Sequence, residues 1–211
     1  MDSSESSVIF TGARSCKEHA PCDTPVVSIP AMHPRLEELS ALLARARDDL
    51  LKAVHEVPDD QRERRPPDGD WSVAEVVDHL RAVEAGSAAL LARRALRARE
   101  AGIGPDPETS SVLGRLDHAD LVDTPVRRVA PDIVRPREGT TTQDALDGLT
   151  ASRAALGDAV RALDGLDATQ VKATHAALGE LDAYQWLLFI AQHELRHARQ
   201  IRMIALALRE E

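Results

Sequence analysis

The C-terminal stretch 186–200 constrains the fold of this chain most, because its apolar residues recur with the period of an amphipathic helix. His193 and His197 lie four residues apart within it, which on a helix places both imidazoles on one face, about one turn apart. A buried imidazole needs a polar partner, and one metal ion can bind two imidazoles at this spacing. The stretch therefore predicts a buried helix that carries two metal ligands, and a firm metal site needs a third.

The composition favours helices. Aromatic residues make up only 2% of the 211 residues, so the core must be built from Leu, Ala, Val and Ile. A chain of this length fits one domain and needs no disulfide staples. The only cysteines, Cys16 and Cys22, lie together near the N-terminus and indicate no disulfide framework.

The charge of the chain excludes two classes of partner. A net charge of −9 opposes binding to nucleic acid and to anionic membrane surfaces. The longest apolar run, near residues 184–191, falls far short of the roughly 20 residues that span a bilayer. No secretory signal precedes the first helical pattern. We therefore expect a cytoplasmic protein that binds neither nucleic acid nor membrane.

Four segments have helical periodicity, and their ends are marked by caps and breakers. The predicted helices cover Pro34 to about Val57, Trp71 or Ser72 to about Ala101, Thr141 or Thr142 to Asp164 and Gly165, and Asp182 to about Arg209. Ser72 with Glu75, and Asp182 with Gln185, form capping boxes. We expect Thr141 or Thr142 to cap the third helix.

The connections between these helices predict an all-α four-helix bundle. Residues 102–140 are rich in proline and glycine and form a long crossover between helices two and three, with room for a short helix over residues 111–121. Such a crossover either passes the end of the bundle or covers a site. A turn is expected over residues 167–179.

Two domain regions are predicted. Residues 1–31 lack periodicity and are expected to be a disordered leader, and residues 32–211 form the helical domain. An ordered pattern begins just after Met32, which is therefore an alternative start. A metal knuckle in this segment would have only three candidate ligands, Cys16, His19 and Cys22, and no flanking structure. A flexible tail is therefore the simpler interpretation.

The third candidate ligand is His79, which lies on the inward face of the second predicted helix. Three neutral imidazoles suit Zn²⁺, Ni²⁺ or a similar divalent ion and leave a coordination position open. The alternative for each histidine alone is a hydrogen-bonded core residue. Glu194 and Gln200 are candidates for groups near the site, and His118 and His175 have no assigned role.

The string from His193 to His197 also matches the His-Glu-x-x-His motif of zincin proteases, in which the Glu is a general base. The residues after His197 lack the Gly and third His of the metzincins, and the chain ends too soon for a separate helix that carries another ligand. No strand-rich half is visible either. A protease is therefore disfavoured.

Three motifs together resemble the DinB-like (DNA-damage-inducible) family of four-helix-bundle metalloenzymes. They are Trp-Ser-Val-Ala-Glu-Val-Val-Asp-His-Leu at 71–80, His-Ala-Ala-Leu-Gly at 175–179 and His-Glu-Leu-Arg-His-Ala-Arg-Gln-Ile at 193–201. The resemblance runs from about Met32 to the C-terminus. It implies a divalent metal held by His79, His193 and His197.

The resemblance also implies a chemistry. Some relatives are S-transferases that use a low-molecular-weight thiol such as mycothiol or bacillithiol, and related proteins include a thiol-dependent isomerase. We therefore expect a divalent-metal-dependent enzyme that transfers such a thiol to small electrophiles, because an open metal position can stabilise a thiolate near neutral pH.

Two other functions stay open at this point. One is a hydrolase that uses metal-bound water, with Glu194 as its catalytic base. The other is a non-catalytic, metal-stabilised stress or binding protein. In either case exposed helix faces make a homodimer possible.

The leader generates the first prediction. Deletion of residues 1–31 should leave the thermal melting temperature unchanged, because the segment has too little apolar content to pack on the bundle. Comparing melts of the full and shortened chains by circular dichroism tests this. A clear fall in melting temperature would show that the leader packs.

Overall fold

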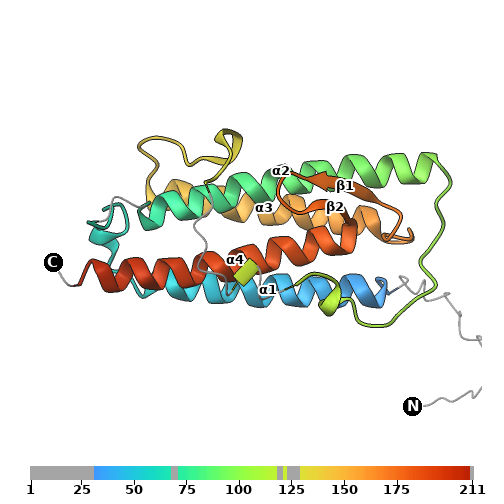
Figure 1. The fold of residues 1–211 in the computed structure, drawn as a ribbon, viewed down its shortest axis with the longest axis horizontal. Helices are drawn as coiled ribbons and strands as arrows, with labels where there is room; N and C mark the ends of the chain where they lie inside the picture. Colours follow the sequence, from blue (N-terminus) through green and yellow to red (C-terminus); the bar gives the residue numbers. More distant parts are fainter. Residues whose placement is uncertain (1–30, 68–70, 118–120, 123–128, 210–211) are drawn as a thin grey trace, which may run out of the picture. The chain divides into compact units, whose positions relative to one another are not determined.

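Four long helices occupy most of the chain in the computed structural model, which describes residues 31–67, 71–117, 121–122 and 129–209 (Figure 1). The bounds are α1 Pro34–His55, α2 Val73–Glu100, α3 Thr142–Leu163 and α4 Ala183–Ala207. The chain divides into two units, Met1–Ala31 and Met32–Glu211, and all of these helices lie in the second. The predicted all-α, four-helix architecture is confirmed.

The helix starts follow the predicted caps. The Ser72 hydroxyl accepts from the Glu75 amide while the Glu75 carboxylate accepts from the Ser72 amide, and Asp182 and Gln185 form the same reciprocal pair. Thr141, the first of the two candidates, caps α3. Each cap satisfies amides that the first turn leaves without a helical partner.

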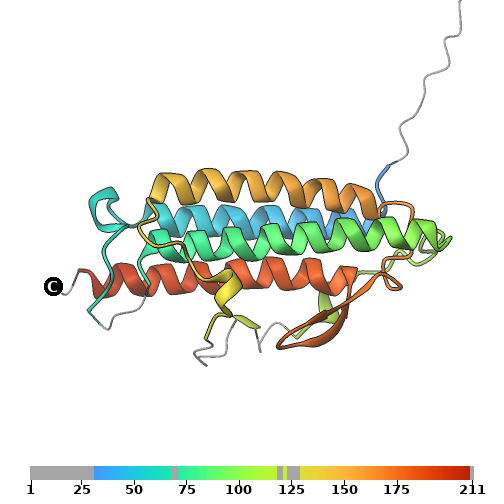
Figure 2. The same ribbon diagram turned by 90° about the horizontal axis from the view of Figure 1, so that it is seen from above.

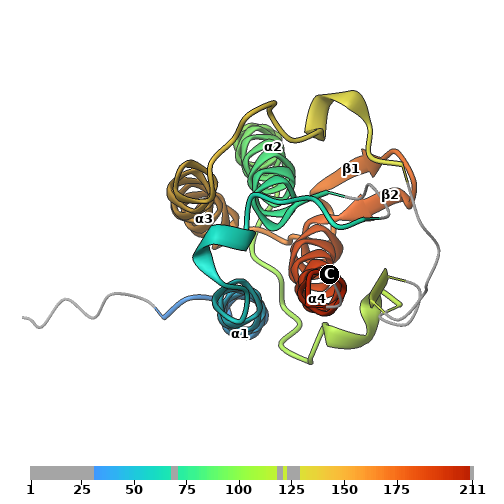
Figure 3. The same ribbon diagram turned by 90° about the vertical axis from the view of Figure 1, so that its left-hand side faces the viewer.

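The helices pack in two pairs. Helix α2 lies mainly against α3, and α4 lies mainly against α1 (Figure 3). The apolar core forms two clusters along the bundle, one around Leu36, Leu91 and Leu156, the other around Leu50, Val77 and Leu149. Between the two clusters, each helix contributes one charged residue: Arg47, Glu84, Arg153 and Glu194.

A small hairpin precedes the last helix and was not predicted. Strand β1, Lys172–His175, pairs antiparallel with β2, Gly179–Asp182, in a register that sets Lys172 opposite Asp182. The sequence predicts only a turn over residues 167–179. The indole Nε1 of Trp186 donates to the Ala173 carbonyl at 3.3 Å, which fastens the hairpin to α4.

The crossover between α2 and α3 differs from the prediction in its described residues. In its described part, residues 111–117 hold one 3₁₀ turn, Leu113–Arg115, where a short helix was expected, and a second 3₁₀ turn covers Asp132–Val134. The crossover first passes the end of the bundle beside α1, and its two 3₁₀ turns then lie on the same side of the bundle as the hairpin (Figures 2 and 3). This placement agrees with the prediction that the crossover either passes the end of the bundle or covers a site.

Several residues singled out from the sequence, namely His118, Cys16, His19 and Cys22, lie outside the described residues. Among the helices of the described chain, none combines the length and apolarity of a membrane span.

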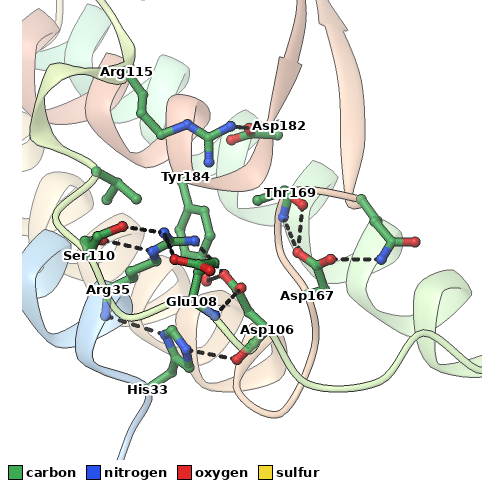
Figure 4. Close-up of polar contacts among 12 residues, drawn as sticks. His33, Arg35, Asp106, Glu108, Ser110, Arg115, Asp167, Thr169, Asp182 and Tyr184 are labelled. Carbon is green, nitrogen blue, oxygen red and sulfur yellow. Dashed lines mark hydrogen bonds and ion pairs between the residues drawn. The ribbon is translucent and has the colours of Figure 1, made fainter.

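A buried polar cluster ties the start of the crossover to α1 and α4 (Figure 4). The Arg35 guanidinium forms a 2.8 Å ion pair with Asp106, and the Tyr184 hydroxyl donates to the same carboxylate oxygen at 2.9 Å. Arg35 also donates to the Ser110 carbonyl. Arg35 and Asp106 are almost fully buried, so each needs the other to neutralise its charge.

This cluster generates the second prediction. Tyr184→Phe removes one hydrogen bond and should lower the free energy of unfolding by about 1 kcal/mol. Asp106→Ala leaves the buried Arg35 charge without its partner and should cost more, roughly 3 kcal/mol. Urea unfolding measures both. Equal losses for the two variants would contradict the assignment of Asp106 as the neutralising group.

Candidate metal centre

The structure brings three histidines together from two helices. His79 comes from α2, and His193 and His197 come from α4. One ring nitrogen from each lies within 4.8 Å of the other two. His79 and His197 are buried and His193 is half-buried, so the site opens on the side of His193.

Hydrogen bonds fix the tautomers of two of these rings. His79 Nδ1 lies 2.7 Å from the Val134 carbonyl oxygen, and His197 Nδ1 lies 2.7 Å from Gln200 Oε1. Both oxygens can only accept, so each Nδ1 carries the proton and each neutral ring keeps a lone pair on Nε2. His197 Nε2 lies 3.1 Å from His193 Nε2.

This arrangement fits a divalent metal. Metal-ligating histidines characteristically donate their other ring N–H to a carbonyl or carboxylate, as His79 and His197 do. Two nitrogens bound to one ion at ~2.0–2.1 Å lie about 3 Å apart, which matches the His193–His197 separation. Without a metal, the same two nitrogens would share one hydrogen bond, as in an ordinary core. The donor set suits Zn²⁺ or Ni²⁺.

Burial keeps the three rings neutral. It lowers the pKa of His197 to about 3, with a further contribution from the neighbouring His79. Burial, together with His197 and His79, also lowers the pKa of His193 well below its usual value, and burial lowers that of His79. Neutral imidazole is the form that binds metal, so no proton has to leave at neutral pH.

The crossover supplies a part of the site that sequence reasoning missed, the carbonyl of Val134. Three residues after this carbonyl, the crossover is bound by Asp78, a fully buried residue that directly precedes His79. Asp78 accepts hydrogen bonds from the Arg137 amide at 2.8 Å and from the Arg137 guanidinium at 2.8 Å. The crossover therefore covers the site on its α2 side, and the only sequence signal was a charged residue beside an inward-facing histidine.

Aromatic rings flank the three histidines. Trp71 lies 5.0 Å from His79, and Phe189 stacks on His193 at 5.3 Å between ring centroids. His175, on the hairpin, lies 4.5 Å from Phe189 and 5.3 Å from Trp186. Both tryptophans and one of the two phenylalanines of the chain thus line this region.

Glu194 occupies a different face of α4. One of its carboxylate oxygens accepts from Arg47 Nε at 2.8 Å, and the other accepts from Arg153 at 2.6 Å. Burial raises the pKa of Glu194 against the effect of these arginines. The contacts of Glu194 among the described residues are thus with α1 and α3, whereas Gln200 does reach the histidines.

Comparisons with known proteins agree with this geometry. The sequence profile of the DinB superfamily matches residues 42–201, a range that includes all three histidines. The chain is also similar to the uncharacterized protein YuaE of Bacillus subtilis (strain 168), with 27% identity over 168 residues, which cover 78% of this chain and 95% of YuaE. No solved structure matches the chain significantly.

The lowered histidine pKa values generate the third prediction. Unfolded histidines titrate near pH 6.5, so between that value and the folded pKa the unfolded chain binds more protons. The stability of the metal-free protein should therefore be complete above about pH 6.5 and should fall as the pH drops to 5. Urea unfolding at several pH values measures this.

The control is His197→Gln, which removes one titrating group. The fall in stability between pH 6.5 and 5 should become shallower in this variant. An identical pH dependence in the two proteins would contradict a buried neutral His197.

Proposed function

Because the chain belongs to the DinB superfamily and brings three neutral histidines around one point, we propose that it is a divalent-metal-dependent enzyme that transfers a low-molecular-weight thiol to small electrophiles. One observation carries the proposal. The Nδ1 protons of His79 and His197 are taken by Val134 and Gln200, so both Nε2 lone pairs remain for a metal.

A divalent ion held by three imidazoles would leave coordination positions open and would lower the pKa of a bound thiol toward neutrality. The residues of the chain would supply the rest. His79, His193 and His197 would hold the ion, and the half-buried side of His193 would admit the ligands. Trp71 and Phe189 would limit access of water with their apolar rings.

The hydrolytic alternative receives less support from the contacts. It requires a general base that can reach a water molecule at the metal. Glu194 was the candidate, and arginines from α1 and α3 bind both of its oxygens. Thiol transfer needs no such base, because the metal itself would favour the thiolate. The homodimer and the cytoplasmic location expected from the sequence stay predictions.

The fourth prediction tests this function. The purified protein should bind one Co²⁺ ion per chain, and addition of a low-molecular-weight thiol should change the visible absorption of the Co²⁺ form. Enzymatic consumption of a small electrophile, such as an alkyl halide or an epoxide, should then require both the metal and the thiol. His193→Ala should abolish metal binding and turnover together while the helical circular dichroism persists.

The other outcomes separate the alternatives. Ester hydrolysis that is indifferent to thiol would favour the hydrolase. Metal binding without turnover across a panel of thiols and electrophiles would favour a non-catalytic, metal-stabilised protein. Failure of the wild-type protein to bind any divalent ion would contradict the whole proposal.

A further inference from the structure

The core of the bundle contains a closed ring of four charged side chains, one from each helix. We call Arg47, Glu84, Arg153 and Glu194 the ionic ring. Arg47 lies 2.9 Å from Glu84 and 2.7 Å from Glu194, and Arg153 lies 2.6 Å from each of the same two carboxylates. Both glutamate side chains are only 3% exposed. The ring is neutral in sum, as a buried set of charges must be.

The two arginines of the ring also bind backbone carbonyls. Arg47 donates to the Leu149 carbonyl and Arg153 donates to the Leu43 carbonyl, so each arginine also bonds the backbone of another helix. The Ser152 hydroxyl donates to Glu84 at 2.5 Å. Every member is thus held by several directional bonds, and small rotations of any helix would break some of them.

The metal site lies across the seam between the two helix pairs. His79 belongs to the α2/α3 pair, whereas His193 and His197 belong to the α1/α4 pair. The position of His79 relative to the two histidines of α4 therefore depends on the contacts that cross this seam.

The ionic ring crosses this same seam twice. Its Arg47–Glu84 bond joins α1 to α2, and its Arg153–Glu194 bond joins α3 to α4. The ring also borders the site in sequence, because Glu194 follows His193 and Glu84 lies five residues after His79 on α2. A rotation of α4 that moved Glu194 out of the ring would swing His193 and His197 away from His79.

We propose that the ionic ring positions the metal ligands, and that Glu194 is a positioning residue within it. The ring sets the rotation and register of the two helix pairs at which the three imidazoles converge. The inference rests on metal binding by the histidines, as in the proposed function. Buried ion pairs add little net stability compared with apolar side chains, but they can specify one arrangement of helices.

The test measures Co²⁺ affinity and the shape of the Co²⁺ absorption bands at a temperature well below the melting of the metal-free protein. Glu194→Gln keeps the size of the side chain and removes its charge. It should weaken Co²⁺ binding about tenfold, the scale of effect seen when groups that orient metal ligands are lost, and it should alter the band shape. An unchanged affinity and spectrum would overturn the proposal.

The matched control is Arg202→Gln. Arg202 forms a 2.6 Å ion pair with Asp49 that also joins α4 to α1, but it lies within one helix pair and does not cross the seam. This variant should bind Co²⁺ with the affinity and spectrum of the wild type. Equal weakening in Arg202→Gln and Glu194→Gln would show a general loss of packing and would overturn the proposal.

A second variant guards against misfolding caused by an unbalanced buried charge. Replacing all four ring residues with Met leaves no net charge in the core and should yield a cooperatively folded bundle. It too should bind Co²⁺ about tenfold more weakly than the wild type. Wild-type affinity in this variant would overturn the inference yet leave the proposed function intact, whereas absence of Co²⁺ binding in the wild type would contradict the proposed function itself.

Discussion

The polar side chains of α4 bind partners on several sides of the helix, and helical geometry decides which neighbour provides each partner. Three adjacent stripes of the helix show this. The first stripe donates to crossover carbonyls through Gln192, Arg196 and Arg199. The second forms the candidate metal site with α2 through His193, His197 and Gln200. The third places Glu194 in the core, toward α1 and α3. One helix thus holds the crossover, the metal ligands and the ionic ring in a fixed relation. The rest of the structure is arranged around these three faces.

The elements that the sequence predicts well are those whose signal is local. Apolar periodicity and capping residues placed the four helices within a few residues of their observed ends, because caps act on the first turn of their own helix. The convergence of His79 with His193 and His197 followed from the inward-facing apolar stripes of two predicted helices. It also required that α2 and α4 be neighbours, which the packing of the four helices provides and no local pattern specifies.

Other features depend on distant contacts that carry no local pattern. The strands Lys172–His175 and Gly179–Asp182 are too short to show alternation, and the hairpin docks through the bond from Trp186. The Val134 carbonyl that orients His79 is a backbone group, so no residue type marks it. Glu194 was ambiguous because a residue 100° from a ligand can face either the site or the next helix. Which one it faces is set by Arg47 and Arg153.

The fate of Glu194 shows why a motif needs its structural context. In a zincin the glutamate of His-Glu-x-x-His serves as a base beside the metal. Here Arg47 of α1 and Arg153 of α3 each form an ion pair with one oxygen of the Glu194 carboxylate. This carboxylate therefore neutralises these arginines. Removing it would leave two guanidinium groups in the core with one carboxylate between them, so the bundle constrains this residue more strongly than the chemistry of the site does. The five-residue pattern therefore identifies two ligands in this fold, and the role of the residue between them follows from the helices that face it.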